Sequence, residues 1–313
     1  MKVGYVALIG RPNVGKSTLL NKMLGQKVAI ISDKPQTTRI SILGIKTTKK
    51  GQIIFIDNPG IHKPLHSLNK RMMNFVYSSL QTADLICLLI DATQKFGHGD
   101  EFVLETLKNI TTPLFLLINK VDIIKKENIL LIIDKYKDLL DFKEIIPLSA
   151  LKGINVDVLE DKIYEFLPEA EKIFSDDEIS DQSQRFLLSE IIREKLLAHV
   201  QQELPFVTAV YIENIEERTR EANEAGIESP SADAQAKQKK PVIYIRASIF
   251  VEKDTHRKII IGRQGQVIKT IGTEARREIE QILDTRIFLD LHIKVREKWR
   301  DSADVLDLIE GQK

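Results

Sequence analysis

The sequence is poor in cysteine and lacks long apolar segments, and each shortage excludes a class of protein. The single cysteine, Cys87, cannot form an internal disulfide and lies within an apolar run typical of a buried strand. No apolar run approaches the roughly 20 residues that a membrane-spanning helix requires. The first residues run directly into a strand-like sequence and lack the pattern of a signal peptide. We therefore expect a cytoplasmic protein without disulfides.

Charge is nearly balanced over the whole chain but not along it. The 313 residues carry a formal net charge of +1, whereas residues 237–300 hold 16 Lys and Arg against 8 Asp and Glu. A chain of this length is enough for about two domains, each with its own core. The late excess of positive charge is typical of a domain that binds a polyanion, although a solvated charged face would have the same composition.

Residues 1–168 alternate apolar strands with helical stretches. Strands are predicted at 3–10, 51–57, 84–92, 112–120 and 144–150. Their Val, Ile and Leu runs lack polar alternation, which indicates strands buried on both faces, as in a mostly parallel sheet covered by helices. The last helix of this half ends at Pro168. The sequence therefore predicts an α/β domain over residues 1–168.

The second half is ordered differently. Residues 169–182 are acidic and polar and are predicted to form a linker. Residues 183–313 then follow the order helix, strand, strand, helix, helix, strand, with a short helical tail. Between the first two strands, residues 218–240 have no apolar periodicity, so we expect a mobile loop there. This order predicts a separate α+β domain.

A phosphate-binding loop follows the first predicted strand. Residues 10–17 read GRPNVGKS and fit the pattern G-x-x-x-x-G-K-[ST]. Their backbone N–H groups would wrap phosphate oxygens at the positive end of the next helix. Lys16 would reach the β- and γ-phosphates, and the Ser17 hydroxyl would ligate Mg²⁺. Nucleotide binding is therefore expected at Gly10, Arg11, Pro12, Asn13, Val14, Gly15, Lys16, Ser17 and Thr18.

The segment Asn119-Lys120-Val121-Asp122 ends another predicted strand and indicates guanine as the base. A carboxylate at Asp122 can accept hydrogen bonds from guanine N1–H and from the 2-amino group. Adenine offers neither donor and would leave the carboxylate unpaired, at a cost of about 1–3 kcal/mol. The Lys120 stem can pack on the base, and Ser149-Ala150 would bring a backbone N–H to guanine O6. These residues predict GTP and GDP as ligands.

The turn Asp57-Asn58-Pro59-Gly60 is similar to the Asp-x-x-Gly switch of nucleotide-binding proteins. Asp57 would hold Mg²⁺ through water, while the Gly60 N–H would sense the γ-phosphate. All four residues are expected to contribute to the GTP site. The following residue, Ile61, stands where many GTP switches carry a glutamine that orients the attacking water.

A first switch is expected in the polar segment 32–40, which a proline interrupts. Thr38 is the expected Mg²⁺ ligand there in the GTP state, with Thr37 as the alternative. The predicted metal ligands are Ser17, Thr38 and Asp57. The predicted catalytic residues are Lys16, Thr38 and Gly60.

The segment Gly262-Arg263-Gln264-Gly265 lies between two predicted helices in the basic region. A lone G-x-x-G is a weak signal, and a helical corner that needs glycine only for its backbone is the alternative. In this context it resembles the clamp of a KH domain, which holds single-stranded RNA beside an apolar groove. The element order fits the type II KH arrangement. RNA contacts are expected at Ile261, Gly262, Arg263, Gln264, Gly265 and Lys269.

Together these motifs resemble the Era family of bacterial ribosome-assembly GTPases over nearly the whole chain. The matching segments are GRPNVGKS (10–17), PQTTR (35–39), DNPG (57–60), NKVD (119–122), LSA (148–150) and IIIGRQGQVIKTIGTEAR (259–276). A relative with two GTPase domains is excluded because the phosphate-binding loop occurs once. The resemblance implies an N-terminal P-loop, Ras-like GTPase domain with a mostly parallel sheet and a C-terminal α+β type II KH domain.

The resemblance also implies an activity and partners. The protein would hydrolyse GTP slowly with Mg²⁺ and bind 16S rRNA near its 3′ end. It would act in assembly of the 30S ribosomal subunit, with peripheral contact at the inner membrane, and we expect a monomer. Two features depart from the family pattern: Asn58 stands where threonine is common, and the loop at 218–240 is longer than expected.

The hydrophobic Ile61 is typical of the Era-like group and therefore indicates membership more than loss of activity. Water would then be oriented by the backbone around Thr38 or by a monovalent cation such as K⁺, with Asn13 as its candidate ligand. Two alternatives stay open. The protein could use GTP only as a structural ligand of an RNA-binding protein, which Ile61 favours. It could also be a P-loop ATPase or nucleotide kinase, against which Asp122 and Ala150 argue.

Overall fold

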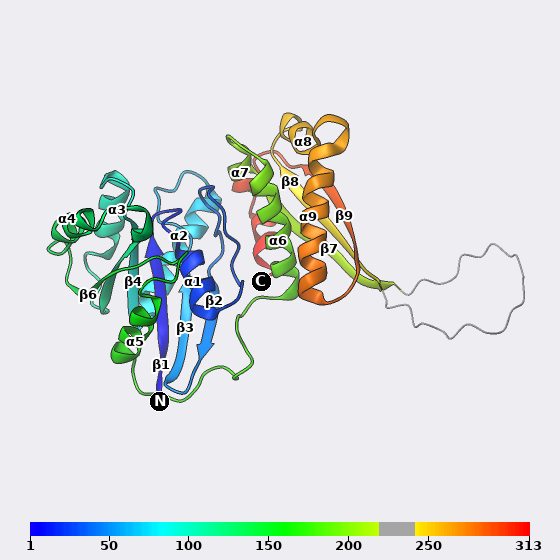
Figure 1. The fold of residues 1–313 in the computed structure, drawn as a ribbon. Helices are drawn as coiled ribbons and strands as arrows, with labels where there is room; N and C mark the ends of the chain where they lie inside the picture. The colour runs from blue at the N-terminus through cyan, green and yellow to red at the C-terminus, as the bar shows by residue number, and fades with distance from the viewer. Residues whose placement is uncertain (219–241) are drawn as a thin grey trace, which may run out of the picture. The chain divides into compact units, whose positions relative to one another are not determined.

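The computed structural model describes residues 1–218 and 242–313, which form two compact units (Figure 1). One unit comprises Met1–Leu187, Arg300–Gly311 and Lys313, and the other comprises Leu188–Trp299 and Gln312. The loop expected at 218–240 lies, apart from its first residue, outside the described residues. Within the described ranges, no helix is both long and apolar enough to cross a membrane.

Six strands form one sheet in the first unit, in the order β2-β3-β1-β4-β5-β6. Their bounds are β1 Lys2–Gly10, β2 Ile42–Thr47, β3 Gly51–Asp57, β4 Leu85–Asp91, β5 Leu114–Asn119 and β6 Phe142–Pro147. Neighbours pair in parallel except β2, which is antiparallel to β3. Every residue of β3, β4 and β5 is buried because helices cover both faces, which explains their continuous apolar sequences.

Strand β2 was missing from the predicted strands. Its sequence, ILGIKT, is short, contains a glycine and ends in polar residues, as suits an edge strand. A Cβ at Gly44 would lie 2.5 Å from Leu20, so the glycine lets helix and strand pack closely. The predicted linker covers the open edge of β2. Ile45 N donates to Ile179 O at 2.9 Å, and this contact protects an edge that could otherwise pair with another chain.

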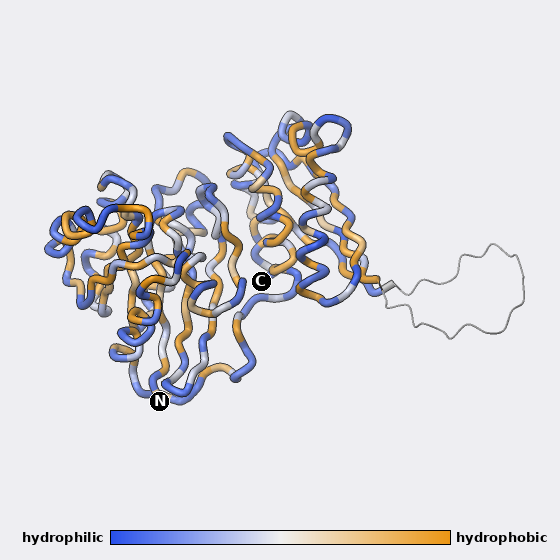
Figure 2. The backbone as a smooth tube through the Cα atoms, viewed as in Figure 1, coloured by the Kyte–Doolittle hydropathy of each residue, from blue (hydrophilic) through white to orange (hydrophobic). Residues whose placement is uncertain are grey.

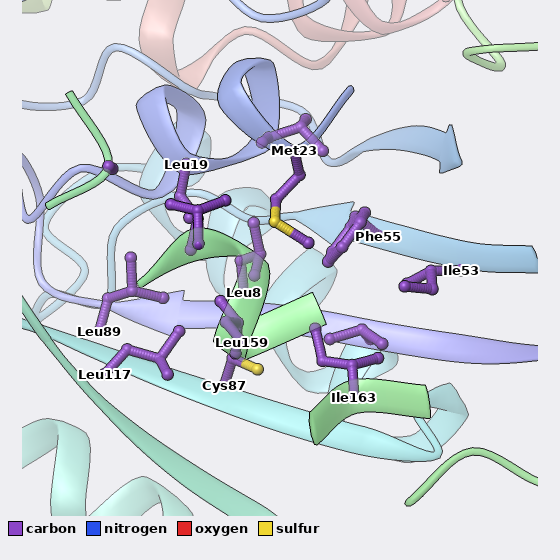
Figure 3. Close-up of a cluster of buried hydrophobic side chains, with 14 of the residues drawn as sticks. Leu8, Leu19, Met23, Ile53, Phe55, Cys87, Leu89, Leu117, Leu159 and Ile163 are labelled. Atoms are coloured by element: carbon purple, nitrogen blue, oxygen red, sulfur yellow. The ribbon is translucent and has the colours of Figure 1, made fainter. Parts of the chain in front are cut away.

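Five helices cover the two faces of this sheet. They are α1 (Lys16–Leu24), α2 (Ser67–Thr82), α3 (His98–Leu107), α4 (Lys126–Tyr136) and α5 (Val156–Phe166), with a short 3₁₀ turn η1 (Val121–Ile123). Helices α1 and α5 pack on one face, where Leu19 and Met23 point toward the strands (Figure 3). Helices α2, α3 and α4 pack on the other. Cys87 lies in the first of these cores, and its burial raises the pKa of the thiol, so we expect no cysteine chemistry.

The second unit is built on a sheet of three strands in the order β7-β8-β9. Strand β7 (Ala209–Arg218) is antiparallel to β8 (Val242–Val251), and β9 (Ile287–Val295) is parallel to β8. Its helical elements are α6 (Gln184–His199), α7 (Leu204–Val207), α8 (Asp254–Ile261), η2 (Arg263–Gly265), α9 (Gln266–Leu283) and η3 (Trp299–Asp301). The start of α6, up to Leu187, and the end of η3, from Arg300, group with the first unit. In both units apolar residues concentrate along the central strands (Figure 2).

The last helix, α10 (Ala303–Glu310), groups with the first unit. Arg71 of α2 donates through Nη1 to Asp307 Oδ1 at 2.6 Å and to Glu310 Oε2 at 3.0 Å. Asp301 Oδ1 accepts from the Ser67 N–H at 2.8 Å, at the first turn of α2. The C-terminal segment is therefore part of the structure that fixes the start of α2.

Candidate functional site

A cavity of about 530 Å³ opens in the first unit where several strands end. Parallel α/β sheets place ligands at the carboxyl ends of their strands, and this cavity follows that rule. It gathers residues that are far apart in the sequence. The predicted nucleotide-binding residues that line it are Pro12, Asn13, Gly15, Lys16, Ser17, Thr18, Gly60, Asn119, Lys120, Asp122, Ser149 and Ala150, together with the switch residue Thr38.

The phosphate-binding loop has a backbone that requires glycine at Gly15. Its φ is 99°, and a Cβ there would lie 2.3 Å from Asn119 Nδ2. Two side chains of the loop point away from the cavity. Val14 is buried in the core, and Arg11 forms an ion pair of 2.9 Å with Asp100 at the start of α3. Arg11 and Val14 could therefore meet a ligand only through their backbone.

Lys16 is buried at the cavity and is held by backbone carbonyl groups. Its Nζ donates to Arg11 O at 3.1 Å and to Gly10 O at 3.5 Å. Burial lowers the pKa of Lys16 to about 8, an effect that the nearby charge of Asp57 opposes. A buried ammonium group held by carbonyl oxygens is well placed to meet phosphate oxygens.

Three oxygen-bearing side chains meet beside this lysine. Ser17 Oγ donates to Asp57 Oδ2 at 2.6 Å, and Thr38 Oγ1 lies 3.0 Å from Ser17 Oγ and 3.4 Å from Asp57 Oδ2. The other carboxylate oxygen, Asp57 Oδ1, is buried without a hydrogen-bond partner among the residues that the structure describes. Burial also raises the pKa of Asp57, although Lys16 opposes this. An orphaned carboxylate oxygen beside two hydroxyl groups fits Mg²⁺, which prefers hard oxygen ligands.

The alternative first-switch residue, Thr37, also lines the cavity, but its hydroxyl is engaged within its own loop. Its hydroxyl donates to Lys34 O at 2.6 Å within the same loop. Of the two threonines, the structure thus brings Thr38 to Ser17 and Asp57.

Asn119 ties the base-reading loops to the phosphate loop. Its Nδ2 donates to Val14 O at 2.7 Å, and its Oδ1 accepts from the N–H groups of Lys120 at 2.8 Å and Ala150 at 2.9 Å. The Ala150 N–H, expected to reach guanine O6, is therefore engaged by Asn119. Asp122 is exposed at the cavity, and no hydrogen bond of its carboxylate is found within the described part of the chain. This carboxylate is available to a base.

Asp91 supports the base-reading loop and was missed from the sequence. Its Oδ2 accepts from Lys120 Nζ at 2.6 Å, and the same Nζ donates to Asn13 O at 3.0 Å. Burial opposes ionisation of Asp91, but the bonds from Lys120 and Thr93 outweigh it and lower its pKa. The signal available was its place at the end of β4, beside the strand that carries Asn119.

In the Asp57–Gly60 turn, Asn58 and Pro59 lie apart from the cavity lining. The Asn58 side chain is fully buried, and its Oδ1 accepts from Ser41 Oγ at 2.7 Å. Neither Asn58 nor Pro59 lines the cavity. Gly60 does line it, and a Cβ there would lie 2.6 Å from the Pro12 backbone. The turn therefore offers backbone to the cavity, and the Asn58 side chain supports the turn from within.

Ile61 is only 2% exposed and packs in the core with residues of α2. Its N–H donates to Gly10 O at 3.0 Å. The side chain faces away from the cavity, so it cannot contact an attacking water. Its backbone instead holds the second switch against the phosphate loop.

A second hollow, of about 460 Å³, lies between α9 and β9 in the other unit. Lys269, Gly272 or Thr273, and Arg276 follow one face of α9 at helical spacing, opposite Phe288, Leu289 and Leu291 of β9. Neither Lys269 nor Arg276 has an ion-pair partner within residues 1–218 and 242–313. Arg276 and Phe288 were missed from the sequence, where only the spacing from Lys269 pointed to Arg276.

The Gly262–Gly265 turn precedes α9 directly and exposes Arg263 and Gln264. Gln264 has a φ of 52°, a rare conformation for a residue with a side chain. Ile261 is partly exposed at the end of α8. Of the predicted RNA-binding residues, Lys269 lines the hollow, and the others lie at the turn that leads into α9.

Each half of the chain matches a known protein family. The family described as 50S ribosome-binding GTPase matches residues 5–120, and the KH domain family matches residues 232–300. The chain is 45% identical over 305 residues to the GTPase Era of Ruminiclostridium cellulolyticum, covering 97% of this chain and 96% of the relative.

Two solved structures are similar over almost the whole chain. One is Era in complex with MgGDPNP and nucleotides 1506–1542 of 16S ribosomal RNA, at a TM-score of 0.88 and 40% identity, covering 99% of this chain and 98% of the other. The second is a variant of Aquifex aeolicus Era bound to GDP and tetrafluoroaluminate, also at a TM-score of 0.88 and 40% identity, covering 99% of each chain.

Proposed function

The chain belongs to the Era family of GTPases, and from that premise we propose a switch that binds 16S rRNA near its 3′ end and acts in maturation of the 30S subunit. The observation that carries the nucleotide part is the convergence of Lys16, Ser17, Thr38, Gly60 and Asp122 on one cavity. These residues come from four separate segments of the chain, and each has the chemistry that a guanine nucleotide requires.

Binding of the phosphates rests on the loop at residues 10–18. Its N–H groups and the N-terminus of α1 would surround the phosphates, and Lys16 would exchange its carbonyl partners for phosphate oxygens. Ser17, Thr38 and Asp57 would hold Mg²⁺, which when bound neutralises the charge on the β- and γ-phosphates. Phosphoryl transfer depends mainly on positioning and charge, so these groups supply much of the catalysis.

Guanine would be recognised by Asp122, whose carboxylate is exposed at the cavity. Asn119 keeps the base loop, the phosphate loop and Ala150 at fixed distances from one another. The Lys120 stem would pack on the base while its ammonium group stays with Asp91. The P-loop ATPase alternative is disfavoured because adenine would leave Asp122 unpaired.

The attacking water would be oriented by backbone groups and, in part, by a monovalent cation, because the Ile61 side chain faces the core. Asn13 Nδ2 donates to Asp33 O in the first switch, so the side-chain oxygen of Asn13 would be the ligand that it offers to a K⁺ ion. Exchange of potassium for sodium in a hydrolysis assay tests this role.

RNA would lie along the hollow between α9 and β9, with its backbone at the Gly262–Gly265 turn. Lys269 and Arg276 would neutralise phosphates, and the apolar wall of β9 would receive bases. The relative solved with nucleotides 1506–1542 of 16S ribosomal RNA supports this choice of RNA. The 30S subunit is accordingly the proposed partner of a cytoplasmic monomer, and peripheral contact with the inner membrane stays a prediction of the family resemblance.

Replacement of Lys16 by alanine tests the nucleotide site. The variant removes the buried cation that faces the phosphates, so we expect at least a tenfold loss in GTP affinity or single-turnover hydrolysis. Exposed Lys70 of α2 is the matched control, and its alanine variant should behave as the wild type. Normal GTP affinity and turnover in Lys16→Ala would contradict the proposal.

A further inference from the structure

The side chain of His62, which follows Ile61, joins the two switch segments to the start of α2. Its Nδ1 lies 2.8 Å from the carbonyl oxygen of Gly60 in the second switch. Its Nε2 lies 3.2 Å from Gln36 Nε2 in the first switch and 3.0 Å from Asn69 Nδ2 in α2. The half-buried imidazole therefore contacts three separate segments around the nucleotide cavity.

The neighbouring groups define which nitrogen of the ring carries hydrogen. Gly60 O can only accept, so Nδ1 must donate to it. The amide of Asn69 is oriented because its Oδ1 accepts from the His66 N–H at 3.1 Å, which turns Nδ2 toward His62. Nδ2 can only donate, so the ring Nε2 accepts. Gln36 Nε2 then shares the single Nε2 lone pair with Asn69 Nδ2 in a three-centre contact, so the three contacts are compatible with one tautomer.

The contact with Gly60 fixes one peptide group from both sides. The carbonyl oxygen of Gly60 accepts from His62, and the N–H of the same peptide, that of Ile61, donates to Gly10 O at 3.0 Å. The Gly60–Ile61 peptide is thus held between the imidazole and the phosphate loop. The Gly60 N–H, the group assigned to the γ-phosphate, belongs to the preceding peptide and is joined to this held peptide through the Gly60 Cα, so holding the one restricts the positions open to the other.

We propose that His62 is a positioning residue for GTP hydrolysis, which aligns the Gly60 backbone and couples it to Gln36 of the first switch. It would act through this alignment and not on the attacking water. The inference rests on the proposed GTP site. It gives this chain a way to order its catalytic backbone although the side chain of Ile61 faces the core.

Single-turnover hydrolysis and GTP affinity, measured on the full chain with Mg²⁺, test the proposal. We expect His62→Ala to lower the hydrolysis rate roughly ten- to hundredfold, because small misplacements of catalytic groups have effects of that size. The dissociation constant for GTP should change less than threefold. His62→Asn places an amide near the former Nδ1 and should recover part of the rate, whereas His62→Gln, with its amide near Nε2, should not.

Gln36→Ala tests the other end of the link. It should lower the rate, and the double variant with His62→Ala should be no slower than His62→Ala alone, because both remove the same connection. Lys63→Ala, at the exposed neighbouring position, should hydrolyse GTP like the wild type.

Three results would overturn the inference: a wild-type rate in His62→Ala, an equal loss of rate and GTP affinity, or equal rates for the asparagine, glutamine and alanine variants. Were His62→Ala to fold poorly, a wild-type rate in Gln36→Ala would also overturn it. Absence of hydrolysis in the wild-type protein would instead contradict the proposed function.

Discussion

At the scale of single residues, the position after Gly60 contributes its backbone, and not its side chain, to the nucleotide site. Ile61 packs against α2 with 2% of its surface exposed, while its N–H holds the phosphate loop. A glutamine there would have to leave the core to reach the cavity. The sequence predicted that Ile61 is not the catalyst, but the buried orientation that explains this could be seen only in the structure.

Asp122 carries the prediction on base choice. In Asp122→Asn the amide can no longer accept both guanine donors, so GTP affinity should fall by about 1–3 kcal/mol, or roughly 5- to 150-fold. Xanthine has a carbonyl in place of the 2-amino group and can accept from the asparagine amide. Affinity for xanthosine 5′-triphosphate should therefore rise in the same variant.

Competition binding against a fluorescent GTP analogue measures both changes. Asp134→Asn, on the exposed surface of α4, provides the matched control for loss of one carboxylate. Unchanged preference for GTP over the xanthine nucleotide in Asp122→Asn would show that another group reads the base.

At the scale of elements, the strands with a continuous apolar sequence could be predicted, whereas the edge strand β2 could not. Every residue of β3, β4 and β5 is buried, so each of these segments is a continuous and mainly apolar run that indicates a buried strand. Strand β2 has one neighbour in the sheet, a glycine that accommodates Leu20, and polar residues at its end. The pairing of β2 depends on contacts with β3 and with the segment 169–182. The local sequence of β2 gives no sign of these contacts.

The candidate site shows the same division. Residues within contiguous motifs, such as Lys16 and Asp122, were predicted because a loop must supply them at fixed spacing. Asp91 and His62 act through partners 29 and 26 residues away in the chain. Such residues become recognisable only when the fold brings the segments together.

Helix α9 allows a sharp test of the RNA groove. Arg276 lines the hollow, whereas Arg277 is the next residue, exposed and directed to another face of the same helix. Arg276→Ala should weaken binding of RNA with the sequence of nucleotides 1506–1542. It should also reduce the slope of log K against log salt by about 0.7–1, because one phosphate contact is lost.

Arg277→Ala makes the same change in net charge and should have a clearly smaller effect. Fluorescence anisotropy over a range of KCl concentrations measures both variants. Equal losses would mean that general positive charge, and not the hollow beside β9, attracts the RNA.

At the scale of the whole molecule, two units with different architectures share one chain, and the predicted fold is confirmed by the family matches. An α/β GTPase domain precedes an α+β KH domain, as expected. The position of α10 could not be foreseen, because its grouping with the first unit depends on Arg71, which lies 236 residues from Asp307. The proposed biological role requires both units, so its decisive test needs the full chain.

That test is single-turnover hydrolysis of GTP by the full chain, with and without RNA of nucleotides 1506–1542. We predict slow hydrolysis by the protein alone and a severalfold faster rate with this RNA. A scrambled RNA of the same length, which keeps the phosphates but not the sequence, should leave the rate unchanged. A protein that binds GTP and RNA but does not hydrolyse GTP under either condition would contradict the account and leave GTP as a structural ligand.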